Sequence, residues 1–413
     1  MDCGQCRAPH HAGNMDKTLF ILGLVGFAMA SPVDFDYFPP NYVKTPLGES
    51  IDKSSMKLLK AAFDVAEDKN VVSSPLGLMT LLALYNSGAS SGTREEITKF
   101  LGGSDYKQAS DSYRDLSGRL SEAAPAALTV ANKVYVSNAY TLKDTFAAAA
   151  RSYRSEVDTL DFSKPVAAAA KINEWANEKT KGNIKEPVSP DVLDPTTAAA
   201  LFNVIYFKGH WHVPFKSAET KDKDFHVSKS STVKKPMMHL LQSLYYTKSS
   251  ALGAQLVELP YKEKGFRMVV VLPDEVDGLP SVLEKAAEKG LLEEVFKLSP
   301  AGADVDLDMP KFDIKTKLDF NNILPKIGVS KLFSEPADGI VEKTSVKVSK
   351  AFQEAFIKVD EEGSTAGAFT GLVLYTESLV SEPPSTIKFT VDRPFLYMIL
   401  FEDKILFTGA YTN

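Results

Sequence analysis

The fold is decided by the stretch Asn203-Val-Ile-Tyr-Phe-Lys-Gly-His-Trp211, in which a short apolar run ends at a lysine and a glycine. The run from Phe202 to Phe207 is too short for a buried helix and indicates a β-strand. Two further runs, Met268 to Leu272 and Phe395 to Phe401, are apolar at every position and predict strands buried on both faces. Residues 405–411 follow the last run after a short turn, so we expect these two strands to pair.

Helical patterns surround these strands. Apolar residues recur at helical spacing from Ile51 to Ala66, and Ser74-Pro75 predicts the start of a second helix. Residues 76–85 of that helix are apolar nearly all round, which is typical of a buried helix. Thr93, with Glu96 three residues later, predicts a capping box for a third, short helix. Helices and strands mixed in this way, without strict alternation, predict an α+β fold.

The composition is that of an ordinary globular protein. The chain has 413 residues, of which 44% are hydrophobic and 24% charged, and its net charge is -6. Residues 216–235 are the most lysine-rich stretch, but Glu219, Asp222 and Asp224 lie within it. We therefore expect neither a nucleic-acid partner nor glycosaminoglycan binding.

The amino terminus predicts export. Residues 19–28 are apolar and are followed by Ala28-Met-Ala30, an A-x-A cleavage pattern; the run is shorter than the ~20 residues of a membrane span. We predict a signal peptide at 15–30, a leading extension of doubtful status at 1–14, and a single secreted domain at 31–413. Met15 is an alternative start. The two cysteines, Cys3 and Cys6, lie in the leading extension, so the mature chain would have none.

Enzyme and metal signatures are weak. Residues 88–92 match G-x-S-x-G, but a nucleophile elbow requires a strand before the serine, and a helix is predicted there. His210 and His212 could bind a metal only with a third ligand, and none follows at ligand spacing. We therefore expect no catalytic residue, no metal and no cofactor, and we keep a hydrolase that uses Ser90 as a remote alternative.

Several motifs occur in a fixed order along the chain and together resemble the serpin family. The match runs from about residue 50 to the end, so it covers nearly the whole predicted mature chain. The motifs are Asn70-Val-Val-Ser-Ser-Pro-Leu76 with Gly88 and Thr93-Arg-Glu95, the N-x-W-x-x-x-x-T-x-G-x-I pattern of residues 173–184, the 203–211 segment, Pro236-Met-Met-His239, Leu259-Pro-Tyr261, Val359-Asp-Glu-Glu-Gly-Ser364, and Asp392-Arg-Pro-Phe395.

The resemblance implies a serpin fold, with three β-sheets, about nine helices and an exposed reactive-centre loop at about 361–385. It also implies a mechanism: a peptidase cleaves the loop, stays acylated, and is trapped as residues 363–376 insert as a central strand. Insertion requires small side chains, and Ser364, Ala366, Ala368 and Thr370 share one face of such a strand. Phe369 is a departure that would point to the other face. The implied hinge comprises Glu361, Glu362, Gly363, Ser364, Thr365, Ala366, Gly367 and Ala368.

The resemblance assigns a conformational switch to four further residues. Ser74 and Asn203 match the region where the central strands part, and Trp175 matches a tryptophan where the loop first enters. Lys311 and Glu361 match an ion pair beside the hinge. Each residue also has a plain structural interpretation, as a helix cap, a core side chain or a surface salt bridge.

The loop sequence restricts the target. Residues 364–387 contain no lysine or arginine, which disfavours trypsin-like peptidases. The usual loop length places the reactive bond between Glu377 and Ser378. Leu374, Tyr375 and Leu379 remain alternatives, which would suit chymotrypsin-like or elastase-like serine peptidases or papain-like cysteine peptidases. We expect a monomer that forms a covalent acyl complex with a secreted peptidase and has no membrane partner. The alternative is a non-inhibitory carrier, storage or chaperone protein of the same fold.

Overall fold

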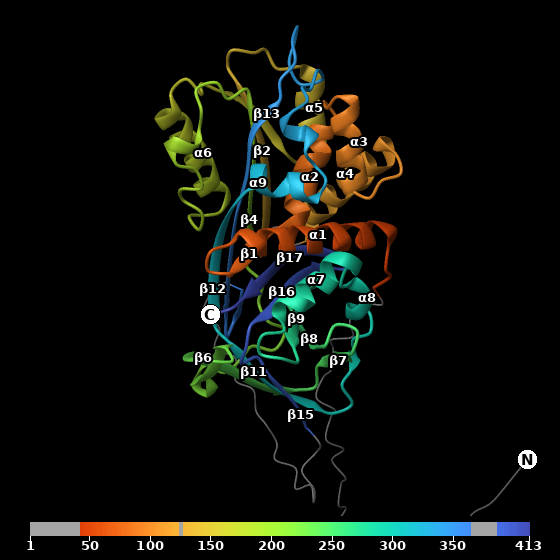
Figure 1. The fold of residues 1–413 in the computed structure, drawn as a ribbon, viewed down its shortest axis with the longest axis vertical. Coiled ribbons are helices and arrows are strands. Elements are labelled where there is room, and N and C mark those ends of the chain that lie inside the picture. Colours follow the sequence, from red (N-terminus) through yellow and green to blue (C-terminus); the bar gives the residue numbers. More distant parts are fainter. Residues whose placement is uncertain (1–41, 124–126, 365–385) are drawn as a thin grey trace, which may run out of the picture. The chain divides into compact units, whose positions relative to one another are not determined.

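The computed structural model describes residues 42–123, 127–364 and 386–413 (Figure 1), all within one unit, Pro39–Asn413. The described residues form three β-sheets and nine α-helices, which confirms the predicted α+β class. No helix among them is long and apolar enough to cross a membrane.

The central sheet is mixed. Its strands pair in the order β12, β13, β4, β2, β3, and β14 pairs with β13. The pairs β13–β4 and β2–β3 are parallel, while the others are antiparallel. The strands are β12 (Phe312–Asp319), β13 (Val348–Asp360), β4 (Ala199–Phe207), β2 (Leu128–Ser137), β3 (Glu156–Leu160) and β14 (Gly363–Ser364).

The other two sheets lie in the lower half of the molecule as drawn in Figure 1, where the first packs beside the lower part of the central sheet. The first has the order β1 (Val71–Ser73), β17 (Lys404–Tyr411), β16 (Phe395–Phe401), β9 (Phe266–Pro273), β8 (Ala254–Pro260), β7 (Tyr245–Ser249) and β10 (Ser299–Pro300). The second has the order β15 (Thr386–Thr390), β11 (Asp304–Pro310), β6 (Ser231–Gln242) and β5 (Lys221–Ser228). As predicted, β9 and β16 are buried at every residue, and β16 pairs with β17.

Helices cover both faces of the central sheet (Figure 1). Alternate residues of β4 enter two separate cores: Ala200, Phe202 and Val204 pack under α6, and Leu201 and Ile205 join the main core that contains α2. This explains why β4 is apolar at nearly every position. The helices are α1 (Pro46–Val65), α2 (Pro75–Asn86), α3 (Ser91–Phe100), α4 (Tyr106–Ala123), α5 (Asp144–Ser152), α6 (Pro165–Lys179), α7 (Leu279–Lys289), α8 (Leu292–Val295) and α9 (Phe320–Ile323), with 3-10 turns at Pro190–Val192, Ser217–Glu219, Leu324–Ile327 and Lys331–Phe333.

One helix start was predicted correctly and one wrongly. Ser74 caps α2, where its hydroxyl accepts from Gly77 N at 3.2 Å and Pro75 is the first helical residue. The capping box at Thr93 and Glu96 does not exist, because α3 begins at Ser91. Both side chains bind a distant segment instead: Thr93 Oγ1 donates to Lys331 O, and the Glu96 carboxylate accepts from Ser330 N and Lys331 N.

Candidate functional site: the closed central sheet and its hinge

The centre of the large sheet is a direct parallel pair. β13 and β4 pair from Val348 beside Ala199 to Ala355 beside Ile205, with a register shift between Val348 and Lys350. Their outer neighbours, β12 and β2, are antiparallel to them. The sheet is therefore closed between β13 and β4.

The hinge lies at one end of this pair. After β13 the chain turns at Glu361 and Glu362 and returns as β14, with Gly363 opposite Asp360. On its other side Gly363 bridges His210, in the continuation of β4. A Cβ atom on Gly363 would lie 2.0 Å from Gly209 O, and its φ is +148°. Only glycine fits between these two walls.

Glu361 and Lys311 are brought together beside this turn. Lys311 Nζ lies 2.7 Å from Glu361 Oε2, and Thr220 Oγ1 donates to Oε1 at 2.8 Å. Burial opposes ionisation of Glu361, but the hydrogen bonds from Lys311 and Thr220 outweigh it and lower the pKa of the carboxyl. The turn is thus held by an ionised side chain as well as by strand pairing.

The tryptophan at the hinge is Trp211, and the assignment of Trp175 to this position is corrected. Trp211 Nε1 donates to Asp360 O, and its backbone N donates to Glu362 O, both at 2.9 Å. Trp175 belongs to α6 and packs in the cluster between that helix and the sheet. Its ring lies 6.0 Å from Nζ of Lys133, a residue paired with Phe202 in the middle of the sheet. Trp175 thus lies on a helix and not on a strand that reaches the hinge.

A buried amide network closes the middle of the sheet. Gln353 on β13 accepts from Ser73 Oγ at 2.9 Å and from Ser74 N at 2.8 Å. Its Nε2 donates to Ser74 O at 2.8 Å and to Asn203 Oδ1 at 2.7 Å. Asn203 in turn donates to Asn132 Oδ1 on β2 at 2.7 Å. The network ties the start of α2 to three adjacent strands.

Sequence reasoning named Ser74 and Asn203, and the structure joins them through Gln353, which it missed. A signal was present: Gln353 interrupts the buried alternation Ala351, Ala355, Ile357 with a polar side chain that is itself fully buried. A buried amide needs partners, so its position was informative.

The predicted hinge residues Thr365, Ala366, Gly367 and Ala368 lie outside the described residues. The same holds for Leu374, Tyr375, Glu377, Ser378 and Leu379, which carry the predicted reactive bond and its alternatives.

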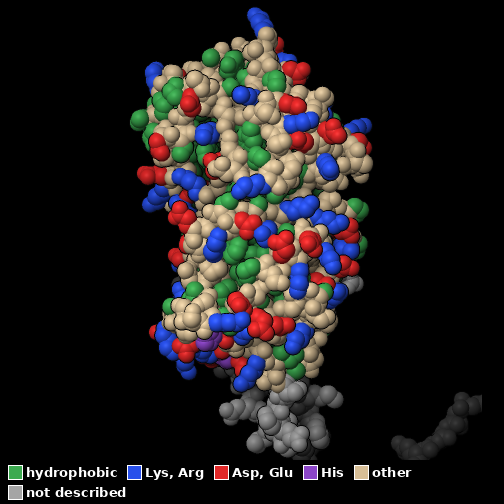
Figure 2. Space-filling model, viewed as in Figure 1, with side chains coloured by type: hydrophobic (Ala, Val, Ile, Leu, Met, Phe, Trp, Pro, Cys, Tyr) green, Lys and Arg blue, Asp and Glu red, His purple; other side chains and the backbone are tan. Residues whose placement is uncertain are grey.

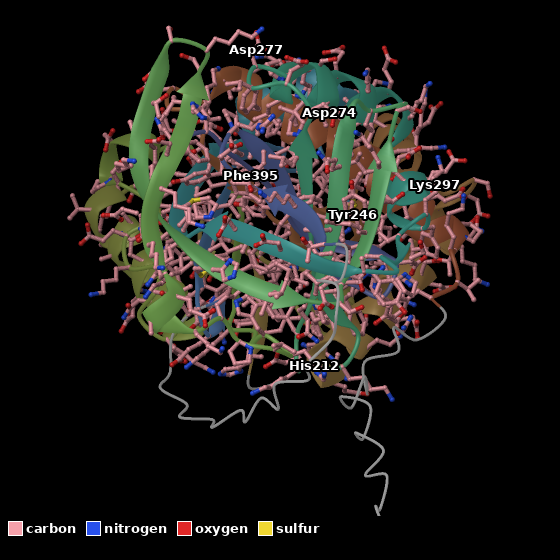
Figure 3. The ribbon with its side chains drawn as sticks, turned by 90° about the horizontal axis from the view of Figure 1, so that it is seen from below. His212, Tyr246, Asp274, Asp277, Lys297 and Phe395 are labelled. Atoms are coloured by element: carbon pink, nitrogen blue, oxygen red, sulfur yellow. The ribbon has the colours of Figure 1, made fainter. Side chains whose placement is uncertain are left out.

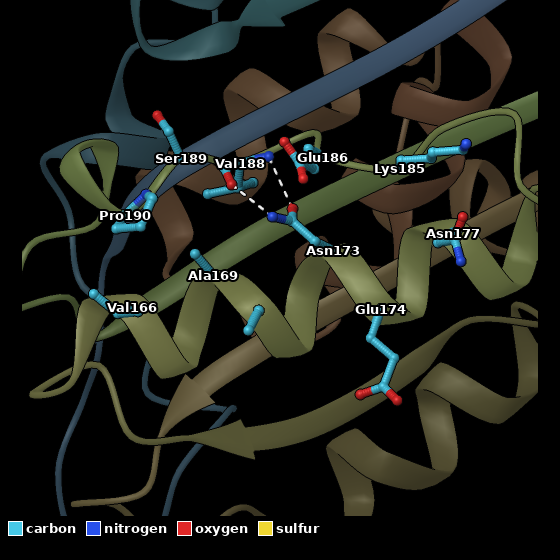
Figure 4. A pocket seen from close by; sticks show the side chains of 11 residues that line it. Val166, Ala169, Asn173, Glu174, Asn177, Lys185, Glu186, Val188, Ser189 and Pro190 are labelled. Carbon is cyan, nitrogen blue, oxygen red and sulfur yellow. Dashed lines mark hydrogen bonds between the residues drawn. The ribbon is translucent and has the colours of Figure 1, made fainter.

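The N-x-W-x-x-x-x-T-x-G-x-I motif is structural. Asn173 on α6 donates to Val188 O at 2.8 Å and accepts from Val188 N at 3.0 Å, which fastens the following segment to the helix (Figure 4). Thr180 Oγ1 accepts from Ile184 N at 2.9 Å. A groove of about 780 Å³ lies between α6 and residues 185–190.

The histidines and Ser90 do not build a catalytic or metal centre among the described residues. His212 lies far from Asp274 and Asp277 (Figure 3), and no group of three potential ligands occurs in the described part of the chain. Ser90 precedes α3 and follows a helix, with Oγ donating to Glu335 at 3.2 Å. The strand that an elbow requires is absent there, so residues 88–92 do not form a nucleophile elbow.

Charges of both signs alternate over the face shown in Figure 2. In the lysine-rich stretch, Lys223 pairs with Asp308 at 2.6 Å and Lys234 with Asp224 at 2.8 Å. These lysines are therefore partly neutralised by neighbours on the same sheet.

Comparison with known proteins identifies the family to which the chain belongs. Residues 49–413 match the family model "Serpin (serine protease inhibitor)". The chain is 36% identical to an antitrypsin of Bombyx mori over 84% of its own length and 88% of the relative's. It is 32% identical to alaserpin of Manduca sexta over 96% and 99%. Among solved structures it is similar to Serpin48 of Tenebrio molitor, with a TM-score of 0.79, 30% identity and coverage of 89% and 98%. It is also similar to human thyroxine-binding globulin bound to its hormone, with a TM-score of 0.78, 26% identity and the same coverage.

A large mixed sheet whose central strands β13 and β4 pair directly, with residues 361–364 docked at one end, is the geometry that the family match has to account for. The chain belongs to the serpin family, as its sequence predicted, and its fold is the serpin fold.

Proposed function

We propose that this chain inhibits a peptidase by suicide trapping. The observation that carries the proposal is the position of the hinge. Gly363 already lies between the end of β13 and the continuation of β4, just beyond the segment where these two strands pair with each other. Inhibitors named among the relatives support the same function. Strand pairing has been started by β14, and cleavage of the loop would free it to continue.

The register of β14 supports this extension. Antiparallel pairing moves one residue back on β13 for each residue forward in the loop, so the pair Asp360–Gly363 leads to Gln353 opposite Thr370. Directly opposite side chains share a face, so insertion would turn Ser364, Ala366, Ala368 and Thr370 toward the main core. Phe369 would lie opposite Glu354, on the α6 side beside Phe352.

The length of β13 favours one reactive bond. Its thirteen residues begin at Val348, and the same register makes Tyr375 the last loop residue that can pair. Cleavage between Glu377 and Ser378 would leave the whole pairing stretch attached to the peptidase, with two residues to spare. Cleavage after Leu374 or Tyr375 would place the acylated residue within the strand itself. The register therefore disfavours Leu374 and Tyr375, and the family's usual loop length then favours Glu377–Ser378 over Leu379.

The proposed reaction stops halfway through hydrolysis. The peptidase nucleophile, a serine hydroxyl or a cysteine thiolate, attacks the carbonyl carbon of Glu377, and the amine of Ser378 leaves with a proton. Insertion of thirteen residues at ~3.3 Å each moves the acylated enzyme on the order of 40 Å before water can attack. The native fold must then be a kinetic trap. We further propose export, with a mature chain of residues 31–413.

Incubation with peptidases tests this function. Residues 31–413 would be mixed separately with chymotrypsin, elastase, trypsin, a glutamate-specific peptidase and a papain-like peptidase, then read by denaturing gel and intact mass. We expect a complex that survives denaturation and a released peptide of residues 378–413, with no such complex from trypsin. Clipping by every enzyme without any complex would refute inhibition of these classes.

One observation favours the alternative function, a non-inhibitory carrier: thyroxine-binding globulin shares the fold at a TM-score of 0.78. Heating the cleaved protein separates the two functions. A marked rise in unfolding temperature after cleavage indicates insertion, while an unchanged temperature favours the carrier.

A further inference from the structure

The wall against which the hinge docks is held by a turn of another sheet. Residues 209–211 form this wall: Gly209 and His210 contact Gly363, and Trp211 binds the backbone of Asp360 and Glu362. Behind it lies the β8–β9 turn, residues 261–265. Lys262 N donates to His210 O at 2.7 Å, and Trp211 bridges Tyr261.

Glu263 joins this turn to His210 through its side chain. Its Oε2 accepts from His210 backbone N at 3.0 Å, and its Oε1 lies 3.0 Å from His210 Nδ1. The Glu263 side chain is 16% exposed, so water competes weakly for these bonds. One carboxylate therefore fixes both the backbone and the ring of the residue that faces Gly363.

The wall has little tolerance for movement. A Cβ atom on Gly363 would lie 2.8 Å from His210 Cα, and one on Gly209 would lie 2.5 Å from the Phe207 ring. These two glycines leave no room for a side chain, so the backbone of residues 209–210 packs directly against β14 and the Phe207 ring.

We infer that Glu263 is a positioning residue that keeps the hinge docked through His210. The inference rests on the proposed function, for which it names a residue that controls trapping efficiency. Glu263 contacts neither the loop nor a peptidase. A docked hinge has already made the first pair of the inserting strand. A released hinge must form that pair again while the acyl bond is exposed to water, so more inhibitor is consumed as substrate.

The chain has two tryptophans, Trp175 and Trp211. The test uses residues 31–413 carrying Trp175→Phe, so that Trp211 alone contributes tryptophan emission. Glu263→Ala is compared with Glu263→Gln, whose amide oxygen can still accept from His210 N, and with Glu288→Ala, an exposed position on α7. For Glu263→Ala we expect red-shifted, more quenchable Trp211 emission and about a tenfold rise in cleaved inhibitor per trapped peptidase, the effect of leaving His210 N without its acceptor. Glu263→Gln and Glu288→Ala should stay within twofold of the parent.

Unchanged emission and partitioning in Glu263→Ala overturn the inference. If that variant does not fold, Glu263→Ser replaces it, since it also removes both contacts with His210 and keeps a small polar side chain in the turn; parent-like emission and partitioning there are equally contrary. If the parent traps none of the peptidases, the proposed function fails. The role of the Glu263–His210 contact in docking the hinge is then judged by Trp211 emission alone.

Discussion

Replacing Gln353 by alanine should let the sheet open without a peptidase. The side chain is fully buried and makes four hydrogen bonds, two of them to the backbone of Ser74 and one to Asn203. Alanine removes all four and leaves a polar cavity where β13 meets α2 and β4. No neighbouring side chain in the network can replace both the donor and the acceptor.

The magnitude follows from the partners left behind. A buried donor or acceptor without a partner costs about 1–3 kcal/mol, and water entering the cavity recovers part of it. With four groups on three residues affected, and water recovering part of the cost, we expect a loss of about 3–6 kcal/mol of native stability. If half of this loss lowers the barrier to opening between β4 and β13, the rate of unprovoked insertion rises on the order of 10- to 100-fold.

The assay is incubation at fixed temperature without peptidase. Active fraction is followed by titration, and native gels separate monomer from oligomer. Gln242→Ala, at the half-exposed end of β6, is the matched control and should keep the parent half-life. A Gln353→Ala half-life within twofold of the parent would refute the reasoning, because it would mean that this network does not hold the sheet closed.

Three further outcomes are expected. Gly363→Val should undock the hinge, since its side chain would overlap Gly209 O, and should raise consumption of inhibitor severalfold in titration, whereas Gly118→Ala, with open space around it, should not. Lys311→Ala should destabilise the protein by about 1 kcal/mol near neutral pH in urea unfolding. Because the folded pKa of Glu361 is lowered, that loss should fade as the pH falls through this pKa, and a pH-independent loss would contradict the pairing. Burial raises the pKa of Asp52 to about 6, from an ordinary 3.8, despite hydrogen bonds from Leu291 N and Leu292 N. Protonation therefore favours the folded state, so the parent should lose about 3 kcal/mol relative to Asp52→Asn as the pH rises from about 4 to 7, and a constant difference would contradict it.

Local patterns predicted the elements well where burial is simple. Residues 395–401 became β16, and the helix expected at 76–85 became α2, because strands and helices buried all round are apolar at every position. Thr93 and Glu96 were misassigned since their partners, Ser330 and Lys331, are more than 230 residues away. A local capping pattern cannot reveal a distant acceptor or donor.

The site was predicted unevenly for the same reason. Lys311, Glu361 and Gly363 lie in motifs whose order the family fixes, and the structure brings them to one end of β13. Trp175 and Trp211 both lie in such motifs, and only the register of β4 and β13 shows that Trp211 faces the hinge. Glu263 carries no motif, because its role depends on a turn that meets the hinge from another sheet.

In the proposed mechanism β13 carries both controls of insertion, and they act in opposite directions. Gln353 closes the middle of the strand and resists opening, while the hinge beyond Asp360, held through His210 and Glu263, prepares insertion. Seven residues separate Gln353 from Asp360, about 23 Å along a strand, which is beyond the range where substitutions usually couple. The double variant Gln353→Ala, Glu263→Ala should therefore show faster spontaneous inactivation and poorer trapping, each equal to its single variant. A rescue of trapping by Gln353→Ala would instead mean that opening of the sheet, and not docking of the hinge, limits insertion.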